Sequence, residues 1–471
     1  MIMNNKPKII LYNPRAEYFD MPLALLALGS VPDPKRFEVI LIDGRIQRDP
    51  LALIRFHLSS ALCVGISVIT GAPILDALRI SAEVKKIRPA VPVIWGGWHP
   101  SLFPKELLLE HDCIDYTVQG PGELSFGKIV ERLAAGADLK GIEGVSMRKG
   151  PGILTWKPAP VSPPGVAGRI NYALIPVEEY FRRKGRRQLD YMASAGCPNR
   201  CTFCAEPVLN GRQYAALTPQ RIFEDLSYYY EKYAFEDVNF QDESFFSSSR
   251  RVSELAEKIT GSRMKFSWAA TMRADQGSRM SDEQWTLCRQ SGLRRLLIGV
   301  ESAWQPRLDS LQKDISILQV LHCAEMCKSL GIAANFPFIV GFPDESEDEF
   351  RAGIKLAVTL RRMSPLFETP MFFFKPYPHA RLNNDCLPAD YRLPSTTLEW
   401  GKFGFSISSG PWVSKRKRRY VNRMNFYLKA AYGHLRSVFL LPLRAISRWR
   451  VNHDCLIIPV EKSLYLLLKN R

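Results

Sequence analysis

The chain has 471 residues, of which 46% are hydrophobic and 24% are charged, an ordinary composition for globular protein and enough for two or three domains. Its ten cysteines are mostly isolated along the sequence, which argues against a secreted disulfide framework and favours the reducing cytoplasm. The first apolar run is too short for a signal peptide, and glycine and proline interrupt residues 58–75. We therefore expect neither secretion nor a transmembrane helix.

The net charge of +17 is concentrated near the C-terminus. Residues 415–471 contain fourteen Lys and Arg against two acidic residues. Most of the excess therefore belongs to the tail and not to a uniformly basic surface of the kind that binds nucleic acid. We rank a nucleic-acid partner low.

Residues 1–150 alternate strands with helices. Apolar runs suited to strands buried on both faces occur at 8–12, 38–43, 62–68, 93–97 and 115–118, and a helix is expected at 74–87. This alternation predicts a doubly wound α/β domain whose ligand lies over the carboxyl ends of the strands. Small or polar residues stand at those ends: Ser67, Thr70, Gly96, Gly97, His99, Gly120 and Glu123. A nucleotide site, another ligand site or a purely structural domain would also fit these residues.

Residues 151–185 are expected to form a linker, because five prolines fall between 151 and 168. In 186–385 strands and helices alternate again. Strands are expected at 189–192, 237–240, 265–270, 295–300, 333–340 and 368–374, and helices at 220–233, 251–260, 282–291, 315–330 and 346–361. Repeated units of this length predict a full or partial TIM-type (β/α) barrel with its function at the carboxyl ends of the strands.

Three cysteines follow the first strand of this second domain. Cys197, Cys201 and Cys204 have the spacing C-x3-C-x2-C, and no fourth cysteine or histidine follows nearby. A closed structural zinc site uses four protein ligands, so three thiolates on one tight loop indicate a metal centre with an open position. A zinc site or an ordinary reactive loop are the alternatives that the spacing leaves.

The spacing, with the aromatic Phe203 before the third cysteine, resembles the signature of the radical S-adenosylmethionine (SAM) enzymes. The resemblance implies that the three thiolates bind three irons of a [4Fe-4S] cluster and that SAM chelates the fourth. It also implies SAM contacts at the strand ends from Asp242, Glu243, Arg273, Gly299, Glu301, Ser302, Gly341 and Pro343. Each of these signals is weak alone, since acidic strand ends often cap helices, and their order along the chain carries the interpretation.

The first domain resembles the cobalamin-binding domain that precedes the cluster domain in one large subgroup of this family. The resemblance implies that the three loops after 62–68, 93–97 and 115–118 line the pocket for the nucleotide tail of cobalamin. The loop after the first strand, residues 13–18, contains no histidine, so cobalamin is expected to bind without a histidine from it. We assign His99 a loop role without cobalt ligation; a histidine in an ordinary turn is the alternative.

The resemblance implies that SAM is cleaved reductively to a 5'-deoxyadenosyl radical, with electrons from an external flavodoxin or ferredoxin type donor. We expect methylation of an unactivated carbon in a small, hydrophobic biosynthetic intermediate. Ring closure or rearrangement is the alternative, and a tRNA-modifying enzyme or a non-catalytic corrinoid carrier ranks lower. His379 follows the last strand, where relatives show Tyr-Pro-Gly, and is the candidate catalytic residue; a solvent-facing loop histidine is the other interpretation.

Residues 386–471 are expected to form a basic helical region. The cluster Lys415–Arg419 precedes an apolar stretch at 438–443, and Arg436, Arg444, Arg448 and Arg450 flank that stretch. This pattern is typical of a basic amphipathic surface and suggests peripheral contact with the inner face of a membrane and a lipid-like substrate. The alternative is a helical cap that packs on the barrel with its arginines in solvent.

Overall fold

The protein is described from a computed structural model, which describes residues 6–404, 409–433, 441–457 and 459–462. Within these ranges the chain divides into two compact units. Of the described residues, the first unit comprises 6–199, 205–243 and 392–404, and the second comprises 200–204, 244–391, 409–433, 441–457 and 459–462.

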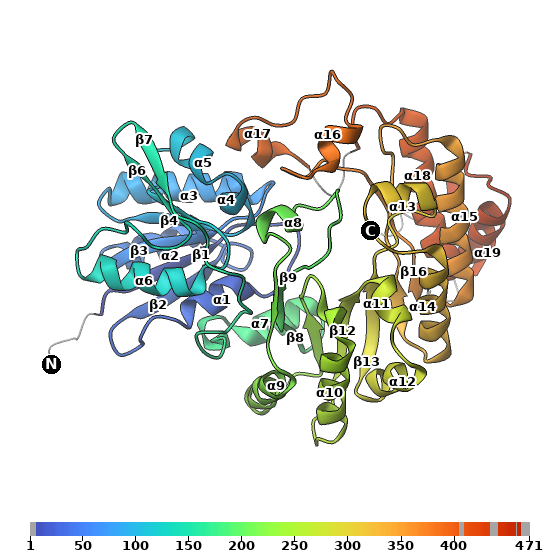
Figure 1. The fold of residues 1–471 in the computed structure, drawn as a ribbon, viewed down its shortest axis with the longest axis horizontal. Coiled ribbons are helices and arrows are strands. Elements are labelled where there is room, and N and C mark those ends of the chain that lie inside the picture. The colour runs from blue at the N-terminus through green and yellow to red at the C-terminus, as the bar shows by residue number, and fades with distance from the viewer. Residues whose placement is uncertain (1–5, 405–408, 434–440, 458, 463–471) are drawn as a thin grey trace. The chain divides into compact units, whose positions relative to one another are not determined.

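A seven-stranded sheet forms the centre of the N-terminal domain (Figure 1). Its strands are β1 (Lys8–Asn13), β2 (Glu38–Asp43), β3 (Ala61–Ser67), β4 (Val93–Gly96), β5 (Tyr116–Val118), β6 (Val145–Lys149) and β7 (Gly152–Thr155). The order is β2-β1-β3-β4-β5-β6-β7, with the first five strands parallel and β6 and β7 antiparallel. The strand order reverses between β1 and β3, which is the point where such sheets bind ligands.

Alternating residues of β1 face the two cores of this domain. Ile9 and Leu11 pack with α1 (Leu23–Gly29) and α6 (Glu123–Ala134) on one face. Ile10 and Tyr12 pack on the other face, which is covered by helices α2 (Pro50–Leu58), α3 (Pro73–Ile87) and α5 (Pro104–Glu110). Burial on both faces explains the uninterrupted apolar runs of the sequence. The predicted doubly wound domain is confirmed.

The first unit also contains the elements between residues 172 and 240. It contains η1 (Tyr172–Leu174), α7 (Val177–Lys184), β8 (Gln188–Tyr191), β9 (Ser194–Gly196), α8 (Glu206–Leu209), β10 (Tyr214–Ala216), α9 (Pro219–Tyr233) and β11 (Asp237–Phe240). The prediction of a linker over 151–185 was wrong at both ends, because β7 and α7 fall inside it. Its start was missed because β7 is the second strand of an antiparallel hairpin with β6, formed through Gly150 at a φ of 56°.

In the second unit, parallel strands again alternate with helices. The strands β12 (Ser267–Met272), β13 (Leu293–Ile298), β14 (Ala333–Asn335) and β16 (Phe367–Glu368) pair in this order, and β15 (Phe338–Val340) pairs with β17 (Met371–Phe373). The helices are η2 (Phe245–Ser247), α10 (Ser249–Thr260), α11 (Ala274–Ser278), α12 (Asp282–Gln290), α13 (Gln305–Ser310), α14 (Ile317–Ser329), α15 (Glu347–Met363), α16 (Leu382–Cys386), α18 (Lys415–Tyr432) and α19 (Leu441–Asn452). This is the repeat of a (β/α) barrel.

Two of the predicted strands are each divided in two. Residues 333–340 form β14 and β15, with Pro337 between them, and residues 368–374 contribute to β16 and β17, with Pro370 between them. Proline has no N–H to donate to a neighbouring strand, so it interrupts the ladder at both places.

The C-terminal region is helical, but it does not form one body. Residues 392–404, with α17 (Thr397–Lys402), belong to the first unit, where Trp400 is buried in the core below β1 and β3. The predicted C-terminal domain of 386–471 is therefore divided, which no local sequence pattern indicates.

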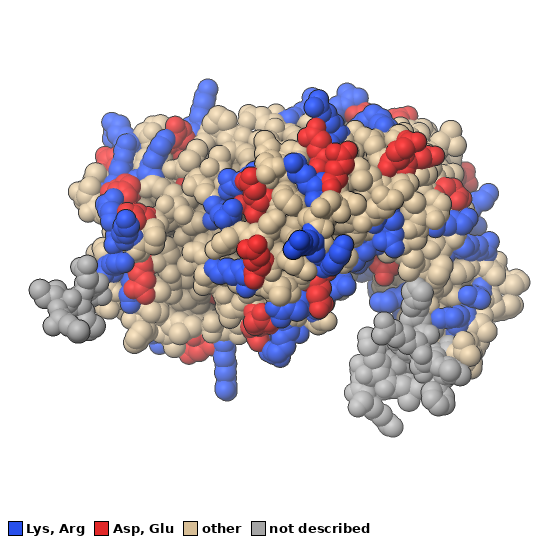
Figure 2. Space-filling view, turned by 90° about the horizontal axis from the view of Figure 1, so that it is seen from below, with Lys and Arg blue, Asp and Glu red and all other residues tan. Residues whose placement is uncertain are grey.

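The surface shows no uniformly basic face in the view of Figure 2, where acidic side chains stand among the Lys and Arg. Of the helices in the described ranges, none is both long enough and apolar enough to cross a bilayer. The predicted apolar stretch falls partly on residues 436 and 438–440, which lie outside the described residues.

Candidate functional site

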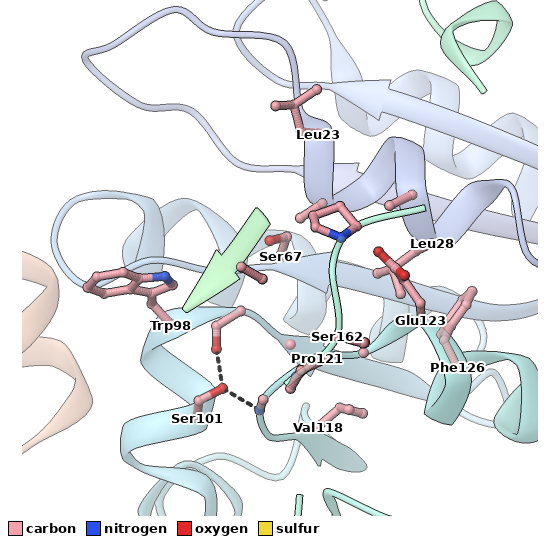
Figure 3. A pocket seen from close by; sticks show the side chains of 18 of the residues that line it. Leu23, Leu28, Ser67, Trp98, Ser101, Val118, Pro121, Glu123, Phe126 and Ser162 are labelled. Atoms are coloured by element: carbon pink, nitrogen blue, oxygen red, sulfur yellow. Dashed lines mark hydrogen bonds between the residues drawn. The ribbon is translucent and has the colours of Figure 1, made fainter. Parts of the chain in front are cut away.

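A cavity of about 240 Å³ opens in the first unit, at the carboxyl ends of β3, β4 and β5. Figure 3 shows the loops that surround it. Leu23 and Leu28 of α1 form one side, and Trp98 begins the short helix α4 (Trp98–Leu102) beside it. Of the predicted cobalamin residues, five line this cavity: Ser67, Gly96, Gly97, Gly120 and Glu123.

Hydrogen bonds of Ser101 join two of the loops around the cavity. The Ser101 hydroxyl donates to the carbonyl of Gly97 at 2.8 Å and accepts from the amide of Gly120 at 3.0 Å (Figure 3). Gly97 has a φ of 97°, and a Cβ there would lie 3.0 Å from the Val68 carbonyl oxygen. A side chain at Gly97 would therefore be strained and crowded. Backbone polar groups and small residues are thus held beside the cavity.

Two carboxyl groups line the cavity, and both have raised pKa values. Burial raises the pKa of Glu123 to about 7. Burial, with a smaller contribution from the nearby Glu206 carboxylate, raises the pKa of Glu243 to about 8. Glu123 Oε1 accepts from the Gly165 amide at 3.3 Å, whereas its buried Oε2 has no hydrogen-bond partner in the described part of the chain.

The residues of the cavity fit the tail of a corrinoid. The lining is mostly apolar, glycines leave the backbone accessible, and Glu123 Oε2 is a buried acceptor that lacks a donor. Buried polar atoms in native proteins are normally paired, and the amide arms and the nucleotide tail of cobalamin carry N–H and O–H donors. A bound corrinoid would satisfy this oxygen.

Thr70 and His99 do not line the cavity. The His99 ring is 1% exposed, and its Nδ1 lies 3.2 Å from the Thr70 hydroxyl. Its ring packs against Phe103, with centroids 5.0 Å apart, and Phe103 packs on Trp400 at 5.7 Å. Burial lowers the pKa of His99 to about 3. His99 is thus a neutral, buried residue that packs under the loop after β4 and supports it.

The three cysteines lie on the loop after β9, and none forms a disulfide. In the first unit the Asn199 side-chain amide donates to Cys197 Sγ at 3.3 Å. In the second unit Arg273 Nη1 donates to Cys201 Sγ at 3.5 Å. Both contacts place a hydrogen-bond donor on a sulfur of the loop. The flanking backbone is fixed, because the Thr202 amide donates to Leu311 and its carbonyl accepts from Leu382.

Within the described ranges, no three His, Cys, Asp or Glu side chains are grouped closely enough to hold one metal ion. A [4Fe-4S] cluster binds each thiolate through a different iron, so its ligands stand farther apart than the ligands of a single ion. The donor set of three cysteines, with amide and guanidinium donors to two of their sulfurs, fits such a cluster better than it fits a mononuclear zinc site.

The two acidic residues after β11, Asp242 and Glu243, have different surroundings. Asp242 is buried and accepts hydrogen bonds from the Ala193 amide at 3.1 Å and from the Ser194 hydroxyl. It therefore holds β9, the strand that leads into the cysteine loop. Glu243, in contrast, lines the cavity of the first unit. Direct contact of these two residues with SAM stays a prediction.

A buried ion pair follows β13 in the second unit. Glu301, with a φ of 64°, accepts from Lys313 Nζ at 2.7 Å, and both side chains are buried. The pair passes close over Gly299, where a Cβ would lie 2.9 Å from Lys313 Nζ, so a side chain there would displace the ends of the paired side chains. Lys313 Nζ also lies 5.7 Å from the centre of the Phe203 ring, and Arg273 donates to the Lys313 carbonyl. Phe203, Arg273, Gly299 and Glu301 therefore lie near one another, and their contact with SAM stays a prediction.

Lys313 and Glu206 lie beside candidate site residues, and the sequence interpretation did not single them out. Lys313 lies on an irregular segment after α13, and no motif marks it. Glu206 lies two residues beyond Cys204, and its proximity to Glu243 appears only in the fold. A charged residue so close to the cysteine loop was the one available signal.

The remaining predicted SAM residues lie on loops of the second unit. The Ser302 hydroxyl accepts from the Trp304 amide at 3.1 Å. Gly341 has a φ of 75°, and its carbonyl accepts from Trp412 Nε1 at 2.8 Å. Pro343 follows on the same turn. The loop that contains Gly341 and Pro343 is therefore anchored to the segment before α18.

His379 is exposed and has a φ of 57°. This left-handed backbone favours glycine, which agrees with its position where a Tyr-Pro-Gly turn was expected. Its place on the loop after β17 is compatible with a substrate contact, and its catalytic role stays a prediction.

Comparison with known families agrees with both resemblances. Residues 191–357 match the Radical SAM superfamily, and residues 8–130 match the B12 binding domain. The fold and the cysteine loop thus define a radical SAM enzyme. The B12 binding domain ahead of it places the chain, more particularly, among the cobalamin-dependent radical SAM enzymes.

Three named proteins are similar to much of the chain. An uncharacterized methyltransferase of Pyrococcus horikoshii is 29% identical over 72% of this chain and 72% of its own length. An anaerobic magnesium-protoporphyrin IX monomethyl ester cyclase of Synechocystis is 22% identical over 71% of this chain and 67% of its own. The hopanoid C-3 methylase of Methylococcus capsulatus is 26% identical over 61% of this chain and 54% of its own.

A solved structure has the same fold along nearly the whole chain. The radical SAM methyltransferase TsrM of Kitasatospora setae, with cobalamin and a [4Fe-4S] cluster bound, superposes with a TM-score of 0.75 at 18% identity. The match covers 96% of this chain and 98% of TsrM. At this identity the likeness concerns the fold alone.

Proposed function

We propose that the protein methylates an unactivated carbon of a small, hydrophobic biosynthetic intermediate, with cobalamin, SAM and a [4Fe-4S] cluster as cofactors. The observation that carries the proposal is the presence, in one chain, of a three-cysteine loop and a strand-end cavity whose buried Glu123 oxygen lacks a donor. When bound, these groups supply radical formation and methyl transfer. The similarity to proteins named as methyltransferases supports methylation over ring closure.

The residues of the chain would bind and orient these groups. Cys197, Cys201 and Cys204 would hold the cluster, and the Arg273 guanidinium donates a hydrogen bond to the Cys201 sulfur. Asp242 keeps β9 in place through the Ala193 amide and thereby orients the loop.

The ion pair of Glu301 and Lys313 stands beside Phe203, in reach of the same loop. In this position Glu301 would accept from the ribose hydroxyls of SAM, and Lys313, which donates to its carboxylate at 2.7 Å, would hold that side chain in place. His379 would stand at the substrate end of the barrel as a hydrogen-bond donor or acceptor.

We further propose a lipid-like substrate and a cytoplasmic enzyme that contacts the inner face of the membrane through its basic C-terminal region. The likeness to a hopanoid methylase supports such a substrate. The electron donor would be a flavodoxin or ferredoxin type protein, because the reductive cleavage of SAM needs one electron from outside the chain.

The test is anaerobic reconstitution with iron, sulfide and cobalamin, followed by incubation with SAM, reductant and candidate lipids. Methyl transfer predicts S-adenosylhomocysteine together with 5'-deoxyadenosine. Formation of 5'-deoxyadenosine alone would favour ring closure or rearrangement. The absence of both products would contradict the proposal. A Cys201→Ala variant, which should form no 5'-deoxyadenosine, is the control for contaminating activity.

A further inference from the structure

The two C-terminal helices α18 and α19 pack against each other and bury one side of each helix. Val421, Met424 and Leu428 of α18 are buried, as are Leu443 and Val451 of α19. Arg448 donates to the Ala431 carbonyl at 3.0 Å, which fixes one helix against the other. The pair is thus a defined element of the second unit.

The outward side of α19 is apolar where a solvent-facing helix is normally polar. Leu441 is 50%, Ile446 42% and Trp449 52% exposed, and Ile457 just beyond the helix is 70% exposed. A single exposed apolar side chain is ordinary, but several on one short helix whose other side is already buried indicate an interaction surface. Tryptophan on such a surface is typical of the boundary between lipid and water.

The first turns of α18 carry a concentration of positive charge that helix stability does not explain. Lys415, Arg416, Arg418 and Arg419 are exposed, and no acidic residue lies in the first turn. The amino end of a helix carries partial positive charge, so cations there destabilise the helix. Of this run, Lys417 pairs with Glu345, which accounts for one residue only. The other four charges are better explained by an anionic partner.

We infer that the outward side of α19, together with the basic start of α18, is a docking surface for an anionic lipid bilayer. Charge complementarity carries the choice of occupant, because residues 415–471 hold fourteen basic and two acidic residues. The apolar side chains would enter the interface while the arginines and lysines contact lipid phosphates. Docking rests on the proposed function for its purpose, since it brings a lipid-like substrate within reach. Lipid binding is nevertheless measured without turnover, so the two can fail separately.

The test is flotation of the full chain with phosphatidylcholine vesicles, with and without phosphatidylglycerol. We expect binding to the anionic vesicles only, and binding that weakens as salt is raised. The variant Arg418→Gln/Arg419→Gln should bind about fivefold more weakly for each charge removed. Its matched control, Lys86→Gln/Lys140→Gln, removes two exposed lysines from the N-terminal domain and should bind like the unchanged protein.

The apolar side is tested by Ile446→Ser/Trp449→Ser, with Trp449→Gln as a second, milder variant. Both should lose most of the binding while retaining the circular dichroism of the unchanged protein. The control is Leu318→Ser, which removes an apolar side chain that is 78% exposed on α14. Equal binding of all variants would overturn the inference, as would equal binding to neutral vesicles.

Two further outcomes would replace the bilayer with another occupant. If the protein is a dimer that Trp449→Gln dissociates, and it does not float with lipid, the surface is an interface between copies. If Arg418→Gln/Arg419→Gln abolishes binding to RNA but leaves flotation unchanged, the basic start of α18 serves a nucleic acid. Either result contradicts the docking surface.

Discussion

Glu123 offers a direct test of the cobalamin cavity through the pH dependence of binding. Its pKa is raised to about 7 by burial, and its Oε2 has no donor in the described part of the chain. If an N–H or O–H of bound cobalamin donates to this oxygen, the ionised carboxylate is the form that binds. Binding should then strengthen as the pH rises through 7.

The expected size follows from the ionised fraction. A carboxyl group with this pKa is ionised to about 9% at pH 6 and to about 91% at pH 8, so the dissociation constant should fall about tenfold between them. Glu123→Gln removes the titration and keeps an acceptor. It should bind with no pH dependence and about fivefold more weakly than the unchanged protein at pH 8, because hydrogen bonds to charged groups are stronger.

In the assay, cyanocobalamin is added stepwise to the full chain, and binding is monitored by the quenching of tryptophan fluorescence. The cobalt ligands of cyanocobalamin do not change protonation in this pH range. Trp98 lines the cavity and should report directly. Glu243, with a pKa raised to about 8, lines the same cavity, so Glu243→Gln is the matched control and should retain the dependence around pH 7. A flat profile for the unchanged protein, or the same slope in Glu123→Gln, would refute the reasoning.

Three other predictions concern stability. Burial lowers the pKa of His99 to about 3, below that of an unfolded histidine. Its contribution to the free energy of unfolding is therefore complete above about pH 6.5 and is lost as the pH falls. At pH 5 the free energy of unfolding should be lower by about 2 kcal/mol. Denaturant unfolding should show this slope, and His99→Phe should flatten it. Trp400→Ala, at a side chain 3% exposed, should cost about 3–5 kcal/mol, whereas Trp449→Ala on the surface should change the unfolding midpoint little. Lys313→Met should cost about 3–5 kcal/mol by leaving Glu301 buried without its partner, and adding Glu301→Gln should restore most of this; no recovery in the double variant would disprove the coupling.

The strands and helices of both domains were largely predictable, because each element has its own pattern of apolar residues and these patterns alternate along the chain. The predicted strands at 38–43 and 237–240 coincide with β2 and β11. The divided strands at Pro337 and Pro370 were predictable in principle from the prolines. The β6–β7 hairpin was missed because proline composition outweighed a weak strand signal.

The site was predictable where residues close in sequence act together. The spacing of Cys197, Cys201 and Cys204 and the glycines after β4 are local features whose chemistry depends on few neighbours. Lys313 was not predictable, because its partner Glu301 lies across an intervening helix and loop. His99 was assigned to the cofactor loop, whereas its ring is buried beneath that loop against Phe103.

By itself, the sequence indicated the class of enzyme, through a cysteine spacing that resembles the radical SAM signature and through the alternation of strands and helices. Only the tertiary structure showed which side chains hold the loops of the candidate site in place. The Ser101 link between two loops, the Glu301–Lys313 pair and the insertion of Trp400 into the first domain all join distant residues. Such contacts exist only once the chain has folded, because burial and the loss of water make them strong.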